Sequence, residues 1–335
     1  MTLLVTGGAG FIGSNFIRYW LQKYPQDTII NLDALTYAGY RESLVDIEKQ
    51  YPRRYRFVRG NIADFEHNLK VLKKFLPDSI INFAAESHNS RAVLNPNIFI
   101  ETNVVGTQRL LEAARRVGTG RFHHISTCEV YGDLPLDSNE RFTEQSPYLP
   151  RTPYNASKAA ADVIVRAYHT TYNLPVTISN ASNNYGPYQF PEKVIPHFTI
   201  RGLSKKKLPL YKQSKHKREW IHVLDHCRAL ELVLLRGIIG ETYNVGTGTE
   251  ADIETIADKV IEVLGLHPSV KTYVEDRPGH DRRYLLDSTK LRMSLGWKPE
   301  IDFHEGMRDT IQWYVQNEAW WRPLLSRLEI NEDSW

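Results

Sequence analysis

The chain has 335 residues, of which 41% are hydrophobic and 24% charged, a composition typical of a globular protein that excludes a disordered or fibrous one. Its 42 Lys and Arg residues nearly balance its 39 Asp and Glu residues, so the charge does not favour nucleic-acid binding. The two cysteines, Cys128 and Cys227, exclude a disulfide-stapled scaffold and favour a reducing compartment.

Short runs of β-branched and aromatic residues alternate with longer amphipathic stretches in the first half of the chain. The sequence predicts strands and helices in turn, beginning with a strand, at Leu3–Thr6, Phe11–Tyr24, Thr28–Leu32, Ser43–Lys49, Tyr55–Arg59, Phe65–Leu76, Ser79–Phe83, Thr102–Val117, Arg121–Ser126, Tyr154–Tyr172 and Pro175–Asn180. This alternation favours parallel pairing through right-handed crossovers. The predicted fold class is therefore α/β, a Rossmann-like doubly wound parallel sheet.

After Asn180 the pattern changes to frequent turns, a basic stretch and shorter helices such as Asp252–Leu264. We predict a larger domain over residues 1–180 and a smaller lobe formed mainly by residues 181–335. We expect later segments to return to the larger domain, because the last strand of the sheet can follow a segment that visits the smaller lobe.

The chain passes from Met1 straight into an apolar strand, without the basic region and cleavage site of a signal peptide. The apolar stretch Val163–Tyr172 is interrupted by Arg166 and His169, and no run reaches the length of a membrane span, roughly 18–20 residues. We therefore expect a cytoplasmic protein that does not cross a membrane.

A glycine-rich turn, Gly7-Gly8-Ala9-Gly10-Phe11-Ile12-Gly13, joins the first strand to the first helix. Its glycines permit a tight turn and let backbone N–H groups approach a pyrophosphate at the positive end of the helix dipole. The second strand leads to Asp33, 20 residues after Gly13, where a carboxylate can bind a ribose diol and repel a 2′-phosphate. The expected cofactor of residues 1–180 is therefore NAD rather than NADP, and no metal site is expected.

Two further strand ends are expected at the same crevice, because the carboxyl ends of parallel strands share one edge of the sheet. Asn61 and Ile62 follow the third strand, where they can meet the adenine, and Ala84 and Ala85 follow the fourth. For each of these four residues a purely structural role is an equally good interpretation.

Tyr154 and Lys158 lie four residues apart at the start of a predicted helix, so their side chains emerge on one face. A phenol, with an ordinary pKa of about 10, is a poor base at neutral pH, and a neighbouring ammonium favours its phenolate. Ser126 and Thr127 end the preceding strand and supply a hydroxyl for the same substrate oxygen. We predict that this group of residues carries the chemistry.

With the glycine turn, these residues resemble the extended short-chain dehydrogenase/reductase family over essentially the whole chain. The similarity narrows to the dTDP-glucose 4,6-dehydratase family through five segments in the same order, at residues 32–39, 84–88, 126–132, 182–193 and 276–284. Separate signatures in one order make the resemblance specific.

The resemblance implies an NAD-dependent lyase that converts a dTDP- or UDP-hexose into its 4-keto-6-deoxy sugar. Tyr154, assisted by Lys158 and Thr127, would deprotonate the 4-hydroxyl as C4 is oxidised. Glu129 would then remove the C5 proton, water would leave from C6, and the hydride would return to C6.

The resemblance also implies a set of substrate-binding residues and a quaternary structure. The substrate-binding residues are Ser87, His88, Asn183, Lys193, Arg218, Arg277 and His280. The smaller C-terminal lobe, residues 181–335, is accordingly expected to be mainly the nucleotide-sugar-binding lobe. The expected assembly is a homodimer in which the helices after Thr102 and Tyr154 pair as a four-helix bundle.

The chain departs from the family pattern at Cys128, where the family has Asp. A thiol holds its proton at neutral pH but is a weak hydrogen-bond donor. Three interpretations stay open: Cys128 is the acid for water loss, Glu129 carries both proton transfers, or the reaction stops at an unsaturated sugar, as in a variant 5,6-dehydratase.

Further departures lie on the substrate side. Residues 88–91, His-Asn-Ser-Arg, replace His-Val-Asp-Arg, and residues 211–215 replace a Tyr-Gly-Asp-Gly-like loop. UDP-N-acetylglucosamine is therefore an alternative substrate to dTDP-glucose. A nucleotide-sugar epimerase and a catalytically silent NAD-binding sensor are the alternative functions, and a base at Glu129 favours the dehydratase over the epimerase.

Overall fold

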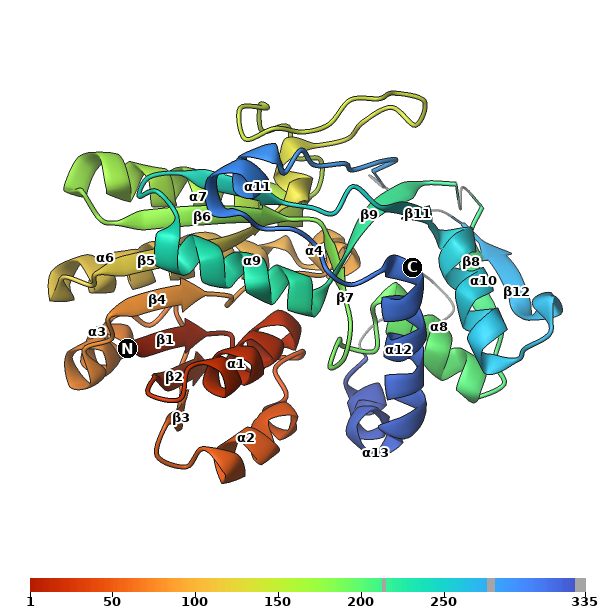
Figure 1. The fold of residues 1–335 in the computed structure, drawn as a ribbon, viewed down its shortest axis with the longest axis horizontal. Coiled ribbons are helices and arrows are strands. Elements are labelled where there is room, and N and C mark those ends of the chain that lie inside the picture. Colours follow the sequence, from red (N-terminus) through yellow and green to blue (C-terminus); the bar gives the residue numbers. More distant parts are fainter. Residues whose placement is uncertain (213–214, 276–280, 329–335) are drawn as a thin grey trace.

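A seven-stranded parallel sheet forms the centre of the molecule (Figure 1). The computed structural model describes residues 1–212, 215–275 and 281–328. The strand order is β10-β6-β5-β4-β1-β2-β3, and every neighbouring pair is parallel. The α/β doubly wound fold class is thereby confirmed, with the order reversing between β1 and β4.

The strands of the sheet are β1 (Thr2–Thr6), β2 (Thr28–Asp33), β3 (Tyr55–Arg59), β4 (Ser79–Asn82), β5 (Arg121–Thr127), β6 (Val176–Ala181) and β10 (Thr242–Val245). The helices of the same domain are α1 (Phe11–Lys23), η1 (Arg41–Leu44), α2 (Val45–Gln50), α3 (Phe65–Phe75), α4 (Asn89–Leu94), α5 (Pro96–Phe99), η2 (Ile100–Gly106), α6 (Thr107–Val117), η3 (Cys128–Tyr131), α7 (Pro153–Tyr172) and α9 (Val223–Arg236). The six predicted strands are all present, with ends shifted by at most one residue.

Helices cover both faces of the sheet, which explains why its strands are apolar throughout. Successive side chains of a strand point to opposite faces, so Leu4 and Ile80 pack in one core with α3, α6 and α7. Leu3 and Ile81 pack in the other core with α1 and α9. The carboxyl ends of the strands are thereby fixed at one edge.

The predicted helix Thr102–Val117 differs from the observed structure. It is preceded and partly replaced by η2, a π-helix over Ile100–Gly106, and only Thr107–Val117 is α-helical. The i→i+5 bonding of a π-helix leaves no separate signature in a 3.6-residue hydrophobic pattern. The helix predicted at Ser43–Lys49 likewise begins with a 3₁₀ turn at Arg41.

The strand β10 follows the first elements of the smaller lobe in sequence and pairs in parallel with β6. The helix α9, which precedes it, packs against α1 on the same sheet. The chain therefore enters the smaller lobe and comes back to complete the sheet.

The smaller lobe has its own apolar core, formed between α8, α10 and α12 and two small sheets, β11-β9-β7 and β12-β8 (Figure 1, right). The elements after β6, other than α9 and β10, are β7 (Asn183–Tyr185), α8 (Val194–Leu203), β8 (Leu208–Tyr211), β9 (Lys217–His222), β11 (Glu250–Asp252), α10 (Ile253–Leu264), η4 (Pro268–Val270), β12 (Lys271–Val274), α11 (Thr289–Leu295), α12 (Phe303–Gln316), α13 (Glu318–Trp321) and η5 (Arg322–Arg327).

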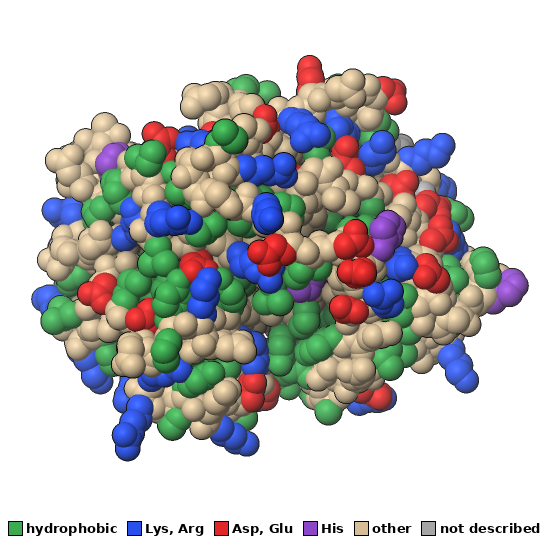
Figure 2. Space-filling view, viewed as in Figure 1, with side chains coloured by type: hydrophobic (Ala, Val, Ile, Leu, Met, Phe, Trp, Pro, Cys, Tyr) green, Lys and Arg blue, Asp and Glu red, His purple; other side chains and the backbone are tan. Residues whose placement is uncertain are grey.

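Acidic and basic side chains are interspersed on the face of the molecule drawn in Figure 2. This arrangement accords with the small net charge of +3. Within the described ranges, none of the helices combines the length and the apolar character that crossing a membrane requires.

Candidate active site

The glycine-rich turn brings β1, the start of α1 and the end of β4 into close contact. Gly7 has φ of +65°, and a Cβ there would lie 2.7 Å from Cα of Ala84. A Cβ on Gly13 would lie 2.5 Å from the carbonyl oxygen of Gly7. Gly10 caps α1 without a side-chain hydrogen bond, so the first-turn N–H groups of the helix are left for an anion.

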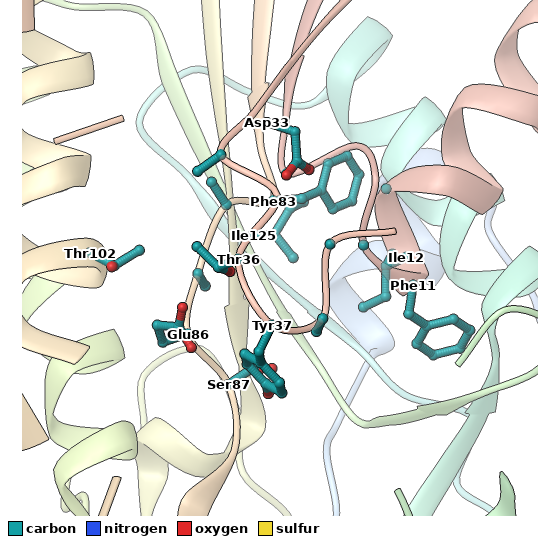
Figure 3. Close-up of a pocket in the computed structure, with 18 of the residues that line it drawn as sticks. Phe11, Ile12, Asp33, Thr36, Tyr37, Phe83, Glu86, Ser87, Thr102 and Ile125 are labelled. Carbon is teal, nitrogen blue, oxygen red and sulfur yellow. The ribbon is translucent and has the colours of Figure 1, made fainter. Parts of the chain in front are cut away.

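A pocket opens beside this turn, along the carboxyl edge of the sheet (Figure 3). All the residues predicted to bind the cofactor line it: Gly7, Gly10, Phe11, Ile12, Gly13, Asp33, Asn61, Ile62, Ala84, Ala85, Tyr154 and Lys158. The structure thus brings together residues from four strand ends and from α7 around one space.

Asp33 ends β2 beside the glycine turn, near Phe83 in Figure 3. Its carboxylate accepts hydrogen bonds from the backbone N–H groups of Ala9, at 2.8 Å, and Leu35, at 2.7 Å. Burial raises the pKa of Asp33, and these two hydrogen bonds act against the increase. The carboxylate is therefore held in one orientation at the wall of the pocket.

The helix α7 presents Tyr154 and Lys158 to the pocket because of how it begins. Thr152 caps it by accepting a hydrogen bond from the N–H of Asn155, and Pro153 occupies its first position. Lys158 donates a 2.7 Å hydrogen bond to the carbonyl oxygen of Ile125. Burial lowers the pKa of Lys158 to about 8, and the charge of Asp162 opposes that change.

The pKa of Tyr154 is raised well above its usual value, opposite to the direction expected from a neighbouring ammonium. Burial is the main cause, followed by the charges of Glu129 and Cys128, and a hydrogen bond with Thr127 acts in the lowering direction. The ammonium of Lys158 is directed to Ile125 instead. The phenol therefore keeps its proton in this arrangement.

Asp162 is a buried member of the same helix face that the sequence analysis missed. It accepts hydrogen bonds from Ser126, at 2.8 Å, and Tyr148, at 2.9 Å. Its spacing of four residues from Lys158 was a signal that could have identified it. The charge of Asp162 acts to raise the pKa of Lys158 and so stabilises the charged form of the lysine.

Thr127, Cys128 and Glu129 lie where β5 passes into η3. Thr127 caps η3 by accepting a hydrogen bond from the N–H of Glu129 at 3.3 Å. The carboxylate of Glu129 accepts a 2.9 Å hydrogen bond from the side-chain amide of Asn89, and its charge raises the pKa of Tyr154. Glu129 is therefore a partly buried carboxylate whose charge acts on the phenol of Tyr154.

Cys128 is 1% exposed and packs in an apolar cluster with Val130, Tyr131 and Tyr284. Its pKa is raised well above the usual value by burial, with smaller contributions from Glu129 and Glu219. Thr127, Cys128 and Glu129 are all absent from the described residues that line the pocket, so the lining does not separate the thiol from its two neighbours. Burial disfavours the thiolate of Cys128.

The residues predicted to bind substrate fall into two groups. Ser87 and Lys193 line the pocket, where the ammonium of Lys193 donates to the carbonyl oxygen of Ser87 at 3.2 Å. His88 caps α4 by accepting from the N–H of Arg91, at 3.4 Å. His88, Asn183 and Arg218 do not line the pocket.

Arg218, on β9, lies over the ring of Tyr284 and donates to the carbonyl oxygen of Asp281 at 2.6 Å. Asn183 begins β7, in register with Trp220 of β9. Arg277 and His280 lie outside the described residues.

The pocket has a further wall that the sequence analysis did not assign. Tyr37, which follows β2, donates a 2.8 Å hydrogen bond to Glu192 of the smaller lobe. The guanidinium of Arg91 lies 3.5 Å from the centre of the Tyr37 ring. Residues 32–39 formed one of the family signatures, but a tyrosine in a loop gave no indication of a partner 155 positions away.

Comparisons with known proteins agree with this geometry. A family model described as GDP-mannose 4,6 dehydratase matches residues 4–310. A dTDP-glucose 4,6-dehydratase of Mycobacterium tuberculosis is 48% identical over 98% of this chain and 98% of its own length. One from Salmonella typhimurium is 46% identical over 96% of this chain and 94% of its own.

Solved structures give the same picture. The dTDP-glucose 4,6-dehydratase DesIV of Streptomyces venezuelae, crystallised with NAD and TYD bound, is 46% identical, with a TM-score of 0.93 over 97% of this chain and 100% of that chain. A UDP-glucose 4-epimerase of Thermus thermophilus in complex with NAD is 32% identical, with a TM-score of 0.87 over 95% of this chain and 100% of that chain. The chain belongs to the nucleotide-sugar 4,6-dehydratase family that the matching model and these dehydratases represent.

Proposed function

We propose that the protein is an NAD-dependent nucleotide-sugar 4,6-dehydratase that acts on dTDP-glucose. The observation that carries the proposal is the connection between Glu129 and the helix of Tyr154: Asn89 bonds the carboxylate at 2.9 Å and bonds Thr152, the cap of α7, at 2.6 Å. Full-length relatives at 46–48% identity are named for this activity. The pocket beside these two groups supplies the cofactor site.

The residues of the pocket fit NAD. The glycine turn leaves first-turn N–H groups for a pyrophosphate, and Asp33 offers a fixed carboxylate to a ribose diol. When bound, NAD would supply the hydride acceptor for C4 and the hydride donor for C6, and C5 would take up a proton from solvent as the hydride reaches C6. A turn that binds a dinucleotide requires glycine where the backbone packs closely. Gly7 and Gly13 meet this requirement, because a Cβ atom at either position would collide with neighbouring backbone atoms.

Tyr154 is the group that takes the proton of the sugar's 4-hydroxyl. Thr127 hydrogen-bonds the phenol and favours its ionisation, and Lys158 lies one helical turn away. Since the phenol is buried, its deprotonation depends on charges that enter the pocket with the ligands.

Glu129 is the group that removes the C5 proton, and we propose that it also delivers a proton to the C6 hydroxyl. One C–H bond at C5 and one C–O bond at C6 break, a C5=C6 double bond forms, and the oxygen leaves as water. Cys128 is a poor candidate for the acid, because its thiol is buried in an apolar cluster and its pKa is raised. The carboxyl group that has just accepted the C5 proton is the donor that remains.

A binding experiment and a product experiment test this function. Purified protein is incubated with dTDP-glucose or UDP-N-acetylglucosamine, and the nucleotide sugar is followed by mass spectrometry. We expect loss of one water from dTDP-glucose. Loss of water from the UDP sugar alone would overturn the substrate, an isomer of unchanged mass would indicate the epimerase, and NAD binding without any product would indicate a sensor.

We further propose a homodimer formed through the segment η2 and the helices α6 and α7. Support comes from large apolar side chains that these elements expose, among them Ile100 at 47% and Val163 at 57%. Light scattering on the Val163→Glu variant tests the interface, with a monomer expected. We propose a cytoplasmic location, in keeping with two free cysteines.

A further inference from the structure

Asn89 connects Glu129 to the start of α7 through two side-chain hydrogen bonds. Its amide nitrogen donates to Glu129 Oε2 at 2.9 Å, and its amide oxygen accepts from the hydroxyl of Thr152 at 2.6 Å. Thr152 Oγ1 in turn accepts from the backbone N–H of Asn155 at 3.2 Å. A single chain of hydrogen bonds therefore joins α4, η3 and α7.

The bonds of this chain run in one direction. The hydroxyl of Thr152 accepts from the backbone N–H of Asn155 and donates to the amide oxygen of Asn89. The NH₂ end of the same amide therefore faces Glu129 and donates to Oε2. Because an NH₂ group can only donate, Oε2 serves as a hydrogen-bond acceptor in this arrangement.

The other carboxylate oxygen, Oε1, has no hydrogen-bond partner within the described residues. The groups that face Glu129 are its neighbour Cys128, Tyr154 on α7, and Asp281 and Tyr284 beyond β12, since its charge raises the pKa of each. Oε1 is therefore the oxygen of Glu129 that is left to accept or donate a proton during the reaction.

We infer that Asn89 is a positioning residue for the proton transfers at C5 and C6. It fixes Oε2, assigns both transfers to Oε1, and sets the carboxylate relative to Tyr154 through the Thr152 cap. This inference rests on the proposed function of Glu129. Asn89 contacts this carboxylate directly and Cys128 precedes it in the chain, so the amide and the buried thiol both belong to the surroundings of the base.

Two variants of Asn89 separate positioning from packing. Asn89→Asp keeps the shape of the side chain and still accepts from Thr152, but it places a second carboxylate against Oε2. Asn89→Leu removes both hydrogen bonds without adding charge. We expect kcat to fall about tenfold to a hundredfold in Asn89→Leu and further in Asn89→Asp, because a hydrogen bond to a charged group is lost or replaced by repulsion.

The readouts are the rate of solvent-deuterium incorporation at C5 and the pH profile of kcat. The pH profile of kcat should change in both variants, because the hydrogen bond to Oε2 is lost or replaced by repulsion. The rate of NAD reduction by substrate, which reports the step at C4, should change less than the rate of C5 exchange.

Asn97→Leu, at an exposed position of the neighbouring helix α5, is the matched control and is expected to leave all rates unchanged. In the Glu129→Gln background, Asn89→Leu should have no additional effect on turnover, because it acts through Glu129. Unchanged rates and pH profile in Asn89→Asp, with active wild-type protein, would overturn the positioning role and leave the proposed function intact. Inactive wild-type protein would instead overturn the proposed function itself.

Discussion

The ammonium of Lys158 lies 2.7 Å from the carbonyl oxygen of Ile125, so a charged group of α7 is hydrogen-bonded to the backbone at the end of β5. Lys158 is only 4% exposed, and the ring of His124 lies on its other side, at 3.4 Å. This bond fixes the spacing between the helix that carries Tyr154 and the strand that carries Thr127. It also makes the lysine a buried ionisable group with measurable consequences.

The stability of the protein should depend on pH through Lys158. Burial lowers its pKa from 10.5 to about 8, so between these values the folded state releases a proton that the unfolded state keeps. Stability relative to Lys158→Met should therefore rise with pH, by about 2 kcal/mol from about pH 7 to about pH 10. Urea unfolding of the wild-type protein and of Lys158→Met at several pH values measures this difference in the free energy of unfolding. Lys70→Met, at an exposed site on α3, is the control and should not change the slope.

Glu129→Gln should abolish dehydration while leaving the cofactor site intact. The amide keeps the size of the side chain but cannot accept the C5 proton, so turnover should fall about 10²- to 10⁴-fold. Solvent-deuterium exchange at C5, followed by NMR, measures the step, and NAD titration checks that binding is unchanged. Normal exchange in this variant would remove the assigned base.

Cys128→Ala should keep most of the activity, within about tenfold, because the thiol packs in an apolar cluster and Glu129 carries the proton in the proposed function. The variant should be modestly less stable, since removing a buried sulfur leaves a small cavity. The rate of water loss with dTDP-glucose measures the first effect and thermal unfolding the second. A loss of activity comparable to that of Glu129→Gln would assign the acid to Cys128 instead.

Gly7→Ala should weaken both folding and NAD binding. Its φ of +65° disfavours any side chain by about 1–2 kcal/mol, and the collision with the backbone of Ala84 adds about 1–3 kcal/mol. Gly118→Ala is the matched comparison, because Gly118 has φ of +71° and no atom within 4 Å of an added Cβ. Denaturant midpoints should therefore separate the two variants, and only Gly7→Ala should lose affinity for NAD.

The sheet could be predicted from the sequence because period-2 and period-3.6 patterns are local properties of the chain. Strand ends such as Asp33 and Asn61 could likewise be placed at one edge, because parallel strands leave no other arrangement. The π-helix could not, because a segment of seven residues is too short for its wider turn to show a period of its own in the apolar pattern.

The contacts between side chains could not be predicted either. Nothing local indicates that Asn89 meets Glu129, or that Lys158 is directed to Ile125 rather than to Tyr154. The direction of the pKa change at Tyr154 depends on burial, which requires the packed structure. The residues of the site could thus be identified individually, whereas their electrostatic relationships required the fold.

The hydrogen bond between Tyr37 and Glu192 joins walls of the pocket that come from different lobes. Moving the lobes apart would break it, so we expect this hydrogen bond to slow the release of a dinucleotide from the pocket. An enzyme that restores its own oxidant in every cycle gains from this retention, because it works without exchange with a cellular pool. Tyr37→Phe removes this hydrogen bond, so the activity of the variant should depend on added NAD.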